Sequence, residues 1–278
     1  YLGIVTTGVW ATVMALVLPV ALGFTKDPSR RRAVLVGANP LSEVLARLLT
    51  GAGRNTTVVD AVPWRLDRFR SEGFTTVSGD ARDASTYEQA GVERDSMVVT
   101  LTTNDELNLL VAELVHAEFG VEHPVVALQS PPEELGKRSR AWVDLLGGRA
   151  VDIPRWMRQI ENQTAHLVEV DPREEETMTA LRQVEREHPT SVLRLAGRSG
   201  GELTLEVGGD RIESLERVHY LALEGRPHEQ LRELVAGADD EAGEAGGGGV
   251  GEGPENGSGE GGEERGEDTA EAAPDREP

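Results

Sequence analysis

The stretch that decides the fold is residues 33–60, AVLVGANPLSEVLARLLTGAGRNTTVVD. The apolar run at 33–36 is typical of a strand that is buried on both faces. Residues 37–39 break this run, and Pro40 then begins a helical pattern of apolar residues that ends at a pair of glycines. A second strand is expected over 56–60, and it closes with an acid. This order predicts one βαβ unit of the dinucleotide-binding type.

The same alternation continues along the chain. We expect helices at 64–73, 86–90 and 104–119, a further helix that opens at Ser130 and ends near Gly147, and strands at 75–78, 97–101, 124–128 and 149–152. Strands that alternate with helices predict an α/β fold, with a Rossmann-like, doubly wound parallel sheet and right-handed crossovers over residues 33–153.

Ligands bind such sheets at the carboxyl ends of the strands, and helix N-termini attract phosphates. The glycine turn and the start of its helix are therefore expected to meet phosphates, and the acid at the end of the second strand to meet ribose hydroxyls. Alternatively, that acid caps the next turn, and the threonines at the end of the fourth strand reflect ordinary strand propensity. The candidate residues are Gly37, Ala38, Asn39, Leu41, Asp60, Thr100 and Thr102.

Residues 33–153 resemble the RCK domain, the regulator of potassium conductance, also called the TrkA N-terminal or KTN domain. The stretches that carry the resemblance are the Gly37 turn, Val59-Asp60, Gly79-Asp80-Ala81, and the run from Thr102 to Asn108. The resemblance implies a cytosolic regulator of monovalent-cation channels or transporters that binds NAD(H) or an adenine nucleotide and forms dimers or rings. It also implies that Asp80 lies near the adenine edge. The alternative is that Asp80 makes an Asx turn after its glycine.

The chain departs from the usual Gly-x-Gly-x-x-Gly motif of that family, because residues 37–42 keep only the first glycine. Asn39 adds a side chain where the phosphate comes close, and Pro40 removes one amide donor from the helix N-terminus.

Residues 1–25 contain no charged side chain, and Lys26 and three arginines follow within 26–32. A run of this length predicts a transmembrane helix, and the basic linker after it predicts a cytosolic location for residues 26–278 of a cell-membrane protein. Two rival interpretations exist. A signal peptide would carry basic residues ahead of its apolar core, and a buried globular helix would rarely be apolar over 24 residues. A channel or transporter segment of the same chain is expected upstream.

Downstream of the sheet, we expect a crossover helix at 154–164. Its apolar stripe of Trp156, Met157 and Ile160 either pairs with a partner subunit or packs on its own sheet. Residues 165–236 resemble a degenerate TrkA C-terminal domain, a small α+β unit. Its expected strands are 167–170, 191–196, 202–207 and 217–223, its expected helices are 176–187 and 227–235, and a hairpin turn is expected at Gly200-Gly201.

The composition narrows the function. The chain has 28 Lys and Arg against 49 Asp and Glu, a net charge of −21, which disfavours nucleic-acid binding. It has no Cys, which excludes disulfides and cysteine nucleophiles. Residues 237–278 hold 14 of the acids and 13 Gly, so we expect a disordered acidic tail.

Three functions stay open. The first is a non-enzymatic regulatory module of potassium transport or cation:proton antiport. The second is a membrane-anchored assembly scaffold without a ligand, and the third is an NAD-dependent oxidoreductase. No catalytic set of residues is recognisable for the third.

Overall fold

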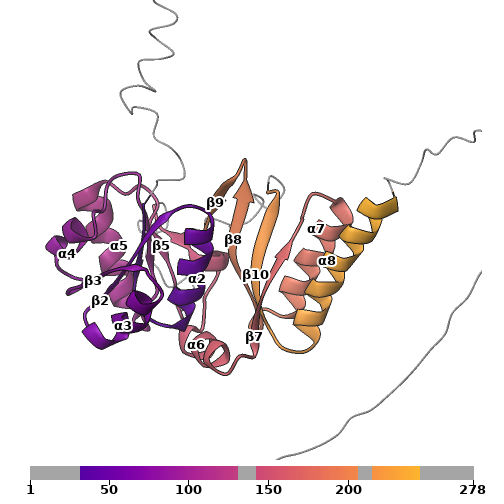
Figure 1. Ribbon diagram of the computed structural model, residues 1–278, viewed down its shortest axis with the longest axis horizontal. Coiled ribbons are helices and arrows are strands. Elements are labelled where there is room, and N and C mark those ends of the chain that lie inside the picture. Colours follow the sequence, from indigo (N-terminus) through magenta and orange to yellow (C-terminus); the bar gives the residue numbers. More distant parts are fainter. Residues whose placement is uncertain (1–31, 131–141, 206–214, 245–278) are drawn as a thin grey trace, which may run out of the picture.

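The computed structural model of the chain describes residues 32–130, 142–205 and 215–244, with side chains to residue 236. Two units lie side by side, with the indigo-to-magenta unit on the left of Figure 1 and the orange-to-yellow unit on the right. Every helix and strand named below falls within these ranges.

The first unit is a parallel six-stranded sheet in the order β3-β2-β1-β4-β5-β6. Its elements are β1 (Arg32–Val36), α2 (Pro40–Gly51), β2 (Asn55–Asp60), α3 (Pro63–Ser71), β3 (Thr75–Ser78), α4 (Ala84–Gln89), β4 (Met97–Thr100), α5 (Asp105–Phe119), β5 (Val125–Val126) and β6 (Asp144–Leu145). The predicted Rossmann-like, doubly wound parallel sheet is confirmed.

The central strand β1 is apolar on both sides because each of its faces lies under a different layer of helices. Ala33 and Leu35 join the cluster formed with α2 and α3, whereas Val34 and Val36 join the cluster formed with α4 and α5. Val36 lies opposite Val59 of β2 and beside Thr100 of β4, which brings the carboxyl ends of these strands to one edge.

The second unit is an antiparallel sheet in the order β7-β10-β8-β9, with two helices on one face. Its elements are β7 (Ala165–Val170), α7 (Glu175–Glu187), β8 (Val192–Ser199), β9 (Glu202–Thr204), β10 (Arg217–Leu223) and α8 (Arg226–Glu244). The predicted hairpin is present, because Ser199 pairs with Glu202 across Gly200 and Gly201. Its likeness to a TrkA C-terminal domain stays a prediction.

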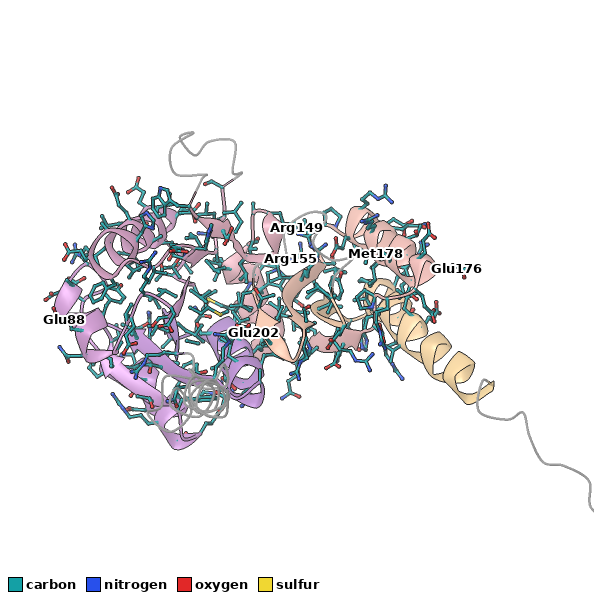
Figure 2. All side chains as sticks on the ribbon, turned by 90° about the horizontal axis from the view of Figure 1, so that it is seen from above. Glu88, Arg149, Arg155, Glu176, Met178 and Glu202 are labelled. Atoms are coloured by element: carbon teal, nitrogen blue, oxygen red, sulfur yellow. The ribbon has the colours of Figure 1, made fainter. Side chains whose placement is uncertain are left out.

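A continuous apolar core joins the two units. Leu193, Leu195 and Leu203 of the second sheet belong to the same buried cluster as the residues of α2. Polar contacts reinforce the junction. Arg54 donates to Glu202 at 3.1 Å and to the Leu203 carbonyl at 2.9 Å. Figure 2 shows Glu202, Arg149 and Arg155 close to this junction, whereas Glu88 and Glu176 lie at opposite ends of the molecule.

Helix α6 (Ile153–Glu161) packs against α2 and leads into β7. Its Trp156 is 3% exposed and belongs to the core that joins the two units, with Met157 and Ile160 packed against the same cluster. Trp156 therefore packs within its own chain, as one of the two interpretations predicted. The other interpretation, that the stripe pairs with a partner subunit, is wrong for this side chain.

The sixth strand is displaced from its predicted position. It lies at Asp144–Leu145, not at 149–152, and the short 3-10 helix η4 (Leu146–Gly148) follows it. Gly147 and Gly148 both have positive φ, 67° and 71°, and turn the chain towards the second unit. Segment 149–152 then leads directly into α6, so the end of the preceding helix near Gly147 was also predicted wrongly. Most of that helix falls on residues 131–141, which lie outside the described residues.

The predicted chain ends fall mainly on residues that the structure does not describe. This holds for the transmembrane helix at 1–25, for 26–31 of the basic linker and for 245–278 of the tail, whereas Arg32 begins β1. Helix α8 continues to Glu244, which corrects the predicted start of the disordered tail at 237. The helix begins at Arg226, and its Leu231 is fully buried in the core of the second unit. Within the described residues, no helix is both long enough and apolar enough to cross a bilayer.

Candidate functional site: the cleft at the carboxyl edge

The strand order reverses between β1 and β4, and two adjoining clefts open at this point of the sheet. Ligands of open α/β sheets bind at such a switch point, outside the carboxyl ends of the strands. The first cleft, about 550 Å³, lies among the ends of β1 to β4 and the start of α5. The second cleft, about 540 Å³, lies among the β1–α2 turn, α3 and α6. Gly37, Asp60, Arg65, Thr102 and Thr103 line both.

The structure brings most of the predicted site residues to these clefts. Asp80 lines the first cleft, and Ala38 and Asn39 line the second. Leu41 and Thr100 line neither, and both are fully buried. Thr100 is buried because its side chain projects from a face of the sheet that helices cover, and not from the carboxyl edge. The binding roles of all these residues stay predictions.

The Asp60 carboxylate ties two loops together. Its Oδ2 accepts the Ala38 N–H at 2.8 Å and its Oδ1 accepts the Val62 N–H at 2.8 Å. The side chain is 9% exposed, and Arg65 Nη1 lies 4.0 Å from Oδ2. These bonds match the interpretation that Asp60 caps the next turn. Each carboxylate oxygen keeps a second lone pair, so ribose binding stays a prediction beside it.

The β1–α2 turn is closed by its own side chains. Asn39 Oδ1 accepts the N–H groups of Leu41 and Ser42, each at 3.0 Å, and Asn39 Nδ2 donates to the Leu101 carbonyl at 2.8 Å. The Ser42 hydroxyl donates to the Gly37 carbonyl. The amides of Ala38, Leu41 and Ser42, which lie where a pyrophosphate binds in dinucleotide-binding folds, therefore already have partners. The turn in this conformation therefore does not fit a pyrophosphate, and the start of α2, where phosphates were expected, has no free N–H at Leu41 or Ser42.

Gly37 allows the turn to approach β4. Its φ is +103°, and a Cβ atom there would lie 3.2 Å from the Leu101 carbonyl carbon and from the Thr102 nitrogen. A side chain at this position would meet both backbone strain and a close backbone neighbour.

Asp80 is paired within its own turn. Its oxygens accept Arg82 Nε at 3.0 Å, Arg82 Nη2 at 2.7 Å and the Arg82 backbone N–H at 2.9 Å. These bonds to Arg82 lower the pKa of the Asp80 carboxyl to about 2. The geometry is that of the Asx turn proposed as the alternative. Gly79 is required beside it, because a Cβ atom there would lie 2.5 Å from Thr86 Oγ1.

Asn108 holds the loop that follows β4, a role that sequence reasoning missed. The side chain is fully buried. Its Oδ1 accepts the Thr102 N–H at 3.0 Å and the Thr102 hydroxyl at 2.6 Å, and its Nδ2 donates to the carbonyls of Thr102 and Ala127, each at 2.8 Å. Asn104 caps α5 by accepting the Leu107 N–H at 3.0 Å. An asparagine between Leu107 and Val111 on the buried side of the helix was the available signal.

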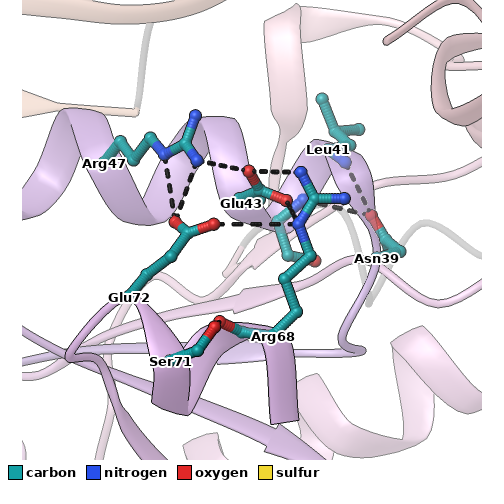
Figure 3. Close-up of polar contacts among 8 residues, drawn as sticks. Asn39, Leu41, Glu43, Arg47, Arg68, Ser71 and Glu72 are labelled. Carbon is teal, nitrogen blue, oxygen red and sulfur yellow. Dashed lines mark hydrogen bonds and ion pairs between the residues drawn. The ribbon is translucent and has the colours of Figure 1, made fainter. Parts of the chain in front are cut away.

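A charged network joins α2 to α3 beside the second cleft, and it too was missed. Glu43, buried in the first turn of α2, contacts Arg47 at 2.6 Å and Arg68 at 2.8 Å, and Glu72 contacts Arg47 at 2.9 Å. Figure 3 shows these four side chains interlocked across the two helices. The hydrogen bond that Arg47 donates to Glu72 raises the pKa of Arg47. Arg68 is thus committed to carboxylates of its own chain.

Two exposed arginines and a tryptophan lie beside the clefts, whose lining also includes the acids Asp60, Asp80 and Glu106. Arg65 is 50% exposed and Arg82 is 67% exposed. The Arg65 guanidinium carbon lies 5.4 Å from the centre of the Trp64 ring, which is itself 70% exposed. Guanidinium groups on a rim recognise anions, and an exposed indole offers a face for stacking.

The family model of the TrkA-N domain matches residues 33–145, which run from β1 through β6. This segment is a TrkA-N domain. The match confirms the resemblance proposed from the Gly37 turn, the Val59-Asp60 strand end and the run from Thr102 to Asn108. Both clefts lie at the carboxyl edge of this TrkA-N domain, although the second also takes side chains from α6.

The TrkA-N segment is similar to parts of larger proteins. The glutathione-regulated potassium-efflux system protein KefC of Cronobacter sakazakii is 27% identical over 93 residues, 34% of this chain and 15% of the relative. The Trk system potassium uptake protein TrkA of Streptomyces coelicolor is 27% identical over 99 residues, 35% of this chain and 44% of the relative. The matches thus span less than half of either relative.

Among solved structures, the TrkA-N domain of the inner membrane protein ybaL from Escherichia coli covers 48% of this chain and 96% of its own. It has 15% identity and a TM-score of 0.38.

Proposed function

We propose that the chain is a regulatory module of a monovalent-cation transport system, for potassium transport or cation:proton antiport. The observation that carries the proposal is the TrkA-N domain at residues 33–145, whose relatives include a potassium-efflux and a potassium-uptake protein. The module acts by binding, without catalysis and without nucleic acid.

The cleft at the carboxyl edge is the input site of this module. Its exposed Arg65 suits an anionic ligand, Arg82 can contribute beside its ion pair with Asp80, and the adjoining Trp64 suits a flat ring. An adenine nucleotide, the class that the family resemblance implies, combines both features. Binding there would act on the elements that meet at the edge, above all the β1–α2 turn and the loop before α5.

We propose that the module lies at the cytosolic side of the cell membrane. Residues 1–25 anchor it, residues 26–31 lie at the membrane surface, and a transport segment lies upstream in the same chain or in a partner. The modules assemble as homodimers or larger rings, as the family resemblance implies.

A second function, an assembly scaffold without a ligand, is favoured by one observation. The turn that binds phosphate in dinucleotide-binding folds is closed here by Asn39. A domain of this kind would hold transport subunits together and leave their activity insensitive to nucleotides. The two functions therefore differ in whether the cleft residues affect ion flux.

Deleting the gene in the source organism and following rubidium uptake and efflux tests the first proposal. We expect the flux of at least one monovalent cation to change, and reintroduction of the parent chain to restore it. Arg82→Glu reverses a charge at the cleft. We expect this variant to be expressed like the parent chain but not to restore normal regulation of the cation flux.

Arg70→Glu is the matched control, because Arg70 is also a surface arginine paired with an aspartate, Asp67 at 2.6 Å, but it does not line either cleft. It should restore regulation as the parent does. If deletion leaves potassium, sodium and proton fluxes unchanged, the transport assignment fails. If Arg82→Glu behaves as Arg70→Glu does, the scaffold is the better description.

A further inference from the structure

Most backbone N–H groups at the start of α2 already have an acceptor within the chain. Gly37 N–H donates to the Val59 carbonyl at 2.8 Å, and Glu43 N–H donates to the Asn39 carbonyl at 3.1 Å. The Ala38 amide is held by Asp60, and the Leu41 and Ser42 amides are held by the Asn39 side chain. Pro40 has no N–H.

The Asn39 side chain is fixed at both ends. Its oxygen caps α2, and its nitrogen donates to the Leu101 carbonyl at the end of β4. It spans the gap between the helix N-terminus and the neighbouring strand, the place that a phosphate occupies in folds of this type. A phosphate that binds there must first displace this side chain and break three hydrogen bonds.

Negative charge beside the turn also disfavours a phosphate at this place. Glu43 and Asp60 both lie close to the start of α2, and their side chains are 7% and 9% exposed. A pyrophosphate would bring further negative charge next to these largely buried carboxylates. The positive charge of Arg68 is already shared by Glu43, at 2.8 Å, and by Glu72, at 3.7 Å, so it offsets the charge of a pyrophosphate only in part.

We propose that Asn39 is a specificity-determining residue that takes the place of the ligand phosphate and keeps dinucleotides out of this cleft. The ligand that the cleft accepts places no phosphate at the N-terminus of α2. This inference concerns what the turn binds, so it holds whether or not the chain regulates ion transport.

Calorimetric titration of the full chain with NAD tests the proposal, in mild detergent because residues 1–25 are apolar. Asn39→Gly restores a glycine in the turn and frees two amides. One hydrogen bond of ordinary net strength is worth about a factor of ten in affinity, so the variant should bind NAD at least about tenfold more tightly than the parent. Adenosine, which has no phosphate, should bind the two proteins equally or not at all.

Asp152→Gly is the matched control, because Asp152 caps α6 by accepting the Arg155 N–H at 2.9 Å. It loses a helix cap of the same kind and should show no gain in NAD affinity. Should Asn39→Gly fail to fold by circular dichroism, Asn39→Ser is the second variant. Serine keeps a short cap but does not reach Leu101, and it too should bind NAD more tightly than the parent.

Parent protein that binds NAD as tightly as the folded variant overturns the proposal, because the side chain would then be no barrier. NAD binding by neither protein overturns it as well, because the exclusion would then arise from something other than Asn39. A gain in Asp152→Gly equal to that in Asn39→Gly would attribute the effect to general loosening of the fold.

Discussion

Replacing Asn108 by alanine removes a fully buried side chain that makes four hydrogen bonds. Two of its partners are backbone groups of Thr102, at the end of β4, and a third is the Ala127 carbonyl after β5. In Asn108→Ala these groups lose their hydrogen-bond partner. The smaller alanine side chain also leaves part of the space unfilled. The perturbation therefore acts on the loop that forms one wall of the first cleft.

The expected loss follows from these bonds. Each contributes about 0.5–1.5 kcal/mol net, and a buried group left without a partner costs about 1–3 kcal/mol. Thr102 is half-buried, so water can replace the asparagine as partner of some Thr102 groups. Ala127 is buried, so its carbonyl is left without a partner. We expect Asn108→Ala to lower the free energy of unfolding by about 3–5 kcal/mol, at the upper end for single substitutions.

Urea unfolding, followed by circular dichroism, measures this difference. Asn162→Ala is the matched control, since Asn162 is exposed at the end of α6, and it should change the unfolding free energy by less than about 0.5 kcal/mol. A loss below about 1 kcal/mol in Asn108→Ala would refute the reasoning. It would mean that the four bonds are not formed in solution or are replaced by water at no cost.

Two further predictions concern the turn and the second unit. Gly37→Ala should destabilise the protein by about 1 kcal/mol or more beyond Gly73→Ala in urea unfolding. Both glycines have positive φ, but only Gly37 faces backbone at 3.2 Å. Burial lowers the pKa of His219, whose neighbours are Glu169 and Arg198, so the folded state binds fewer protons than the unfolded state. Stability should be lost as pH falls below about 6.5, less so in His219→Gln, and equal pH dependence of the two proteins would contradict this.

The alternation of apolar runs was enough to predict the parallel sheet, because each of its central strands is covered on both faces and has to be apolar throughout. The strand at the edge of the sheet, β6, was harder to predict. Strand β6 has only two residues, and its position is set by Gly147 and Gly148, which turn the chain against β8. That turn depends on the second unit, so the local pattern at 149–152 could not reveal it.

The candidate site shows the same division between local and tertiary signals. Spacing placed Gly37, Asp60 and Thr102 at one edge correctly, because the register of parallel strands brings their ends together. The spacing did not show that the amides of Leu41 and Ser42 are capped, because this follows from the conformation of the Asn39 side chain. The contribution of Arg65 to both clefts was missed because an arginine on an exposed helix face carries no distinctive pattern.

Asn39, Asp60 and Asn108 perform one physical task at three points of the carboxyl edge. The backbone donors and acceptors where parallel strands end have to find partners, since leaving them unpaired in a buried place is costly. These side chains supply the partners from within the chain, so a ligand gains little from the same backbone groups. Its affinity has to come from side chains on the rim. Arg65 is the clearest of these, because it lines both clefts, is half exposed and lies no closer than 4.0 Å to Asp60. We expect an anionic ligand that enters from either side to meet this guanidinium, so Arg65 supplies affinity, whereas Asn39 of the turn determines which ligands are excluded.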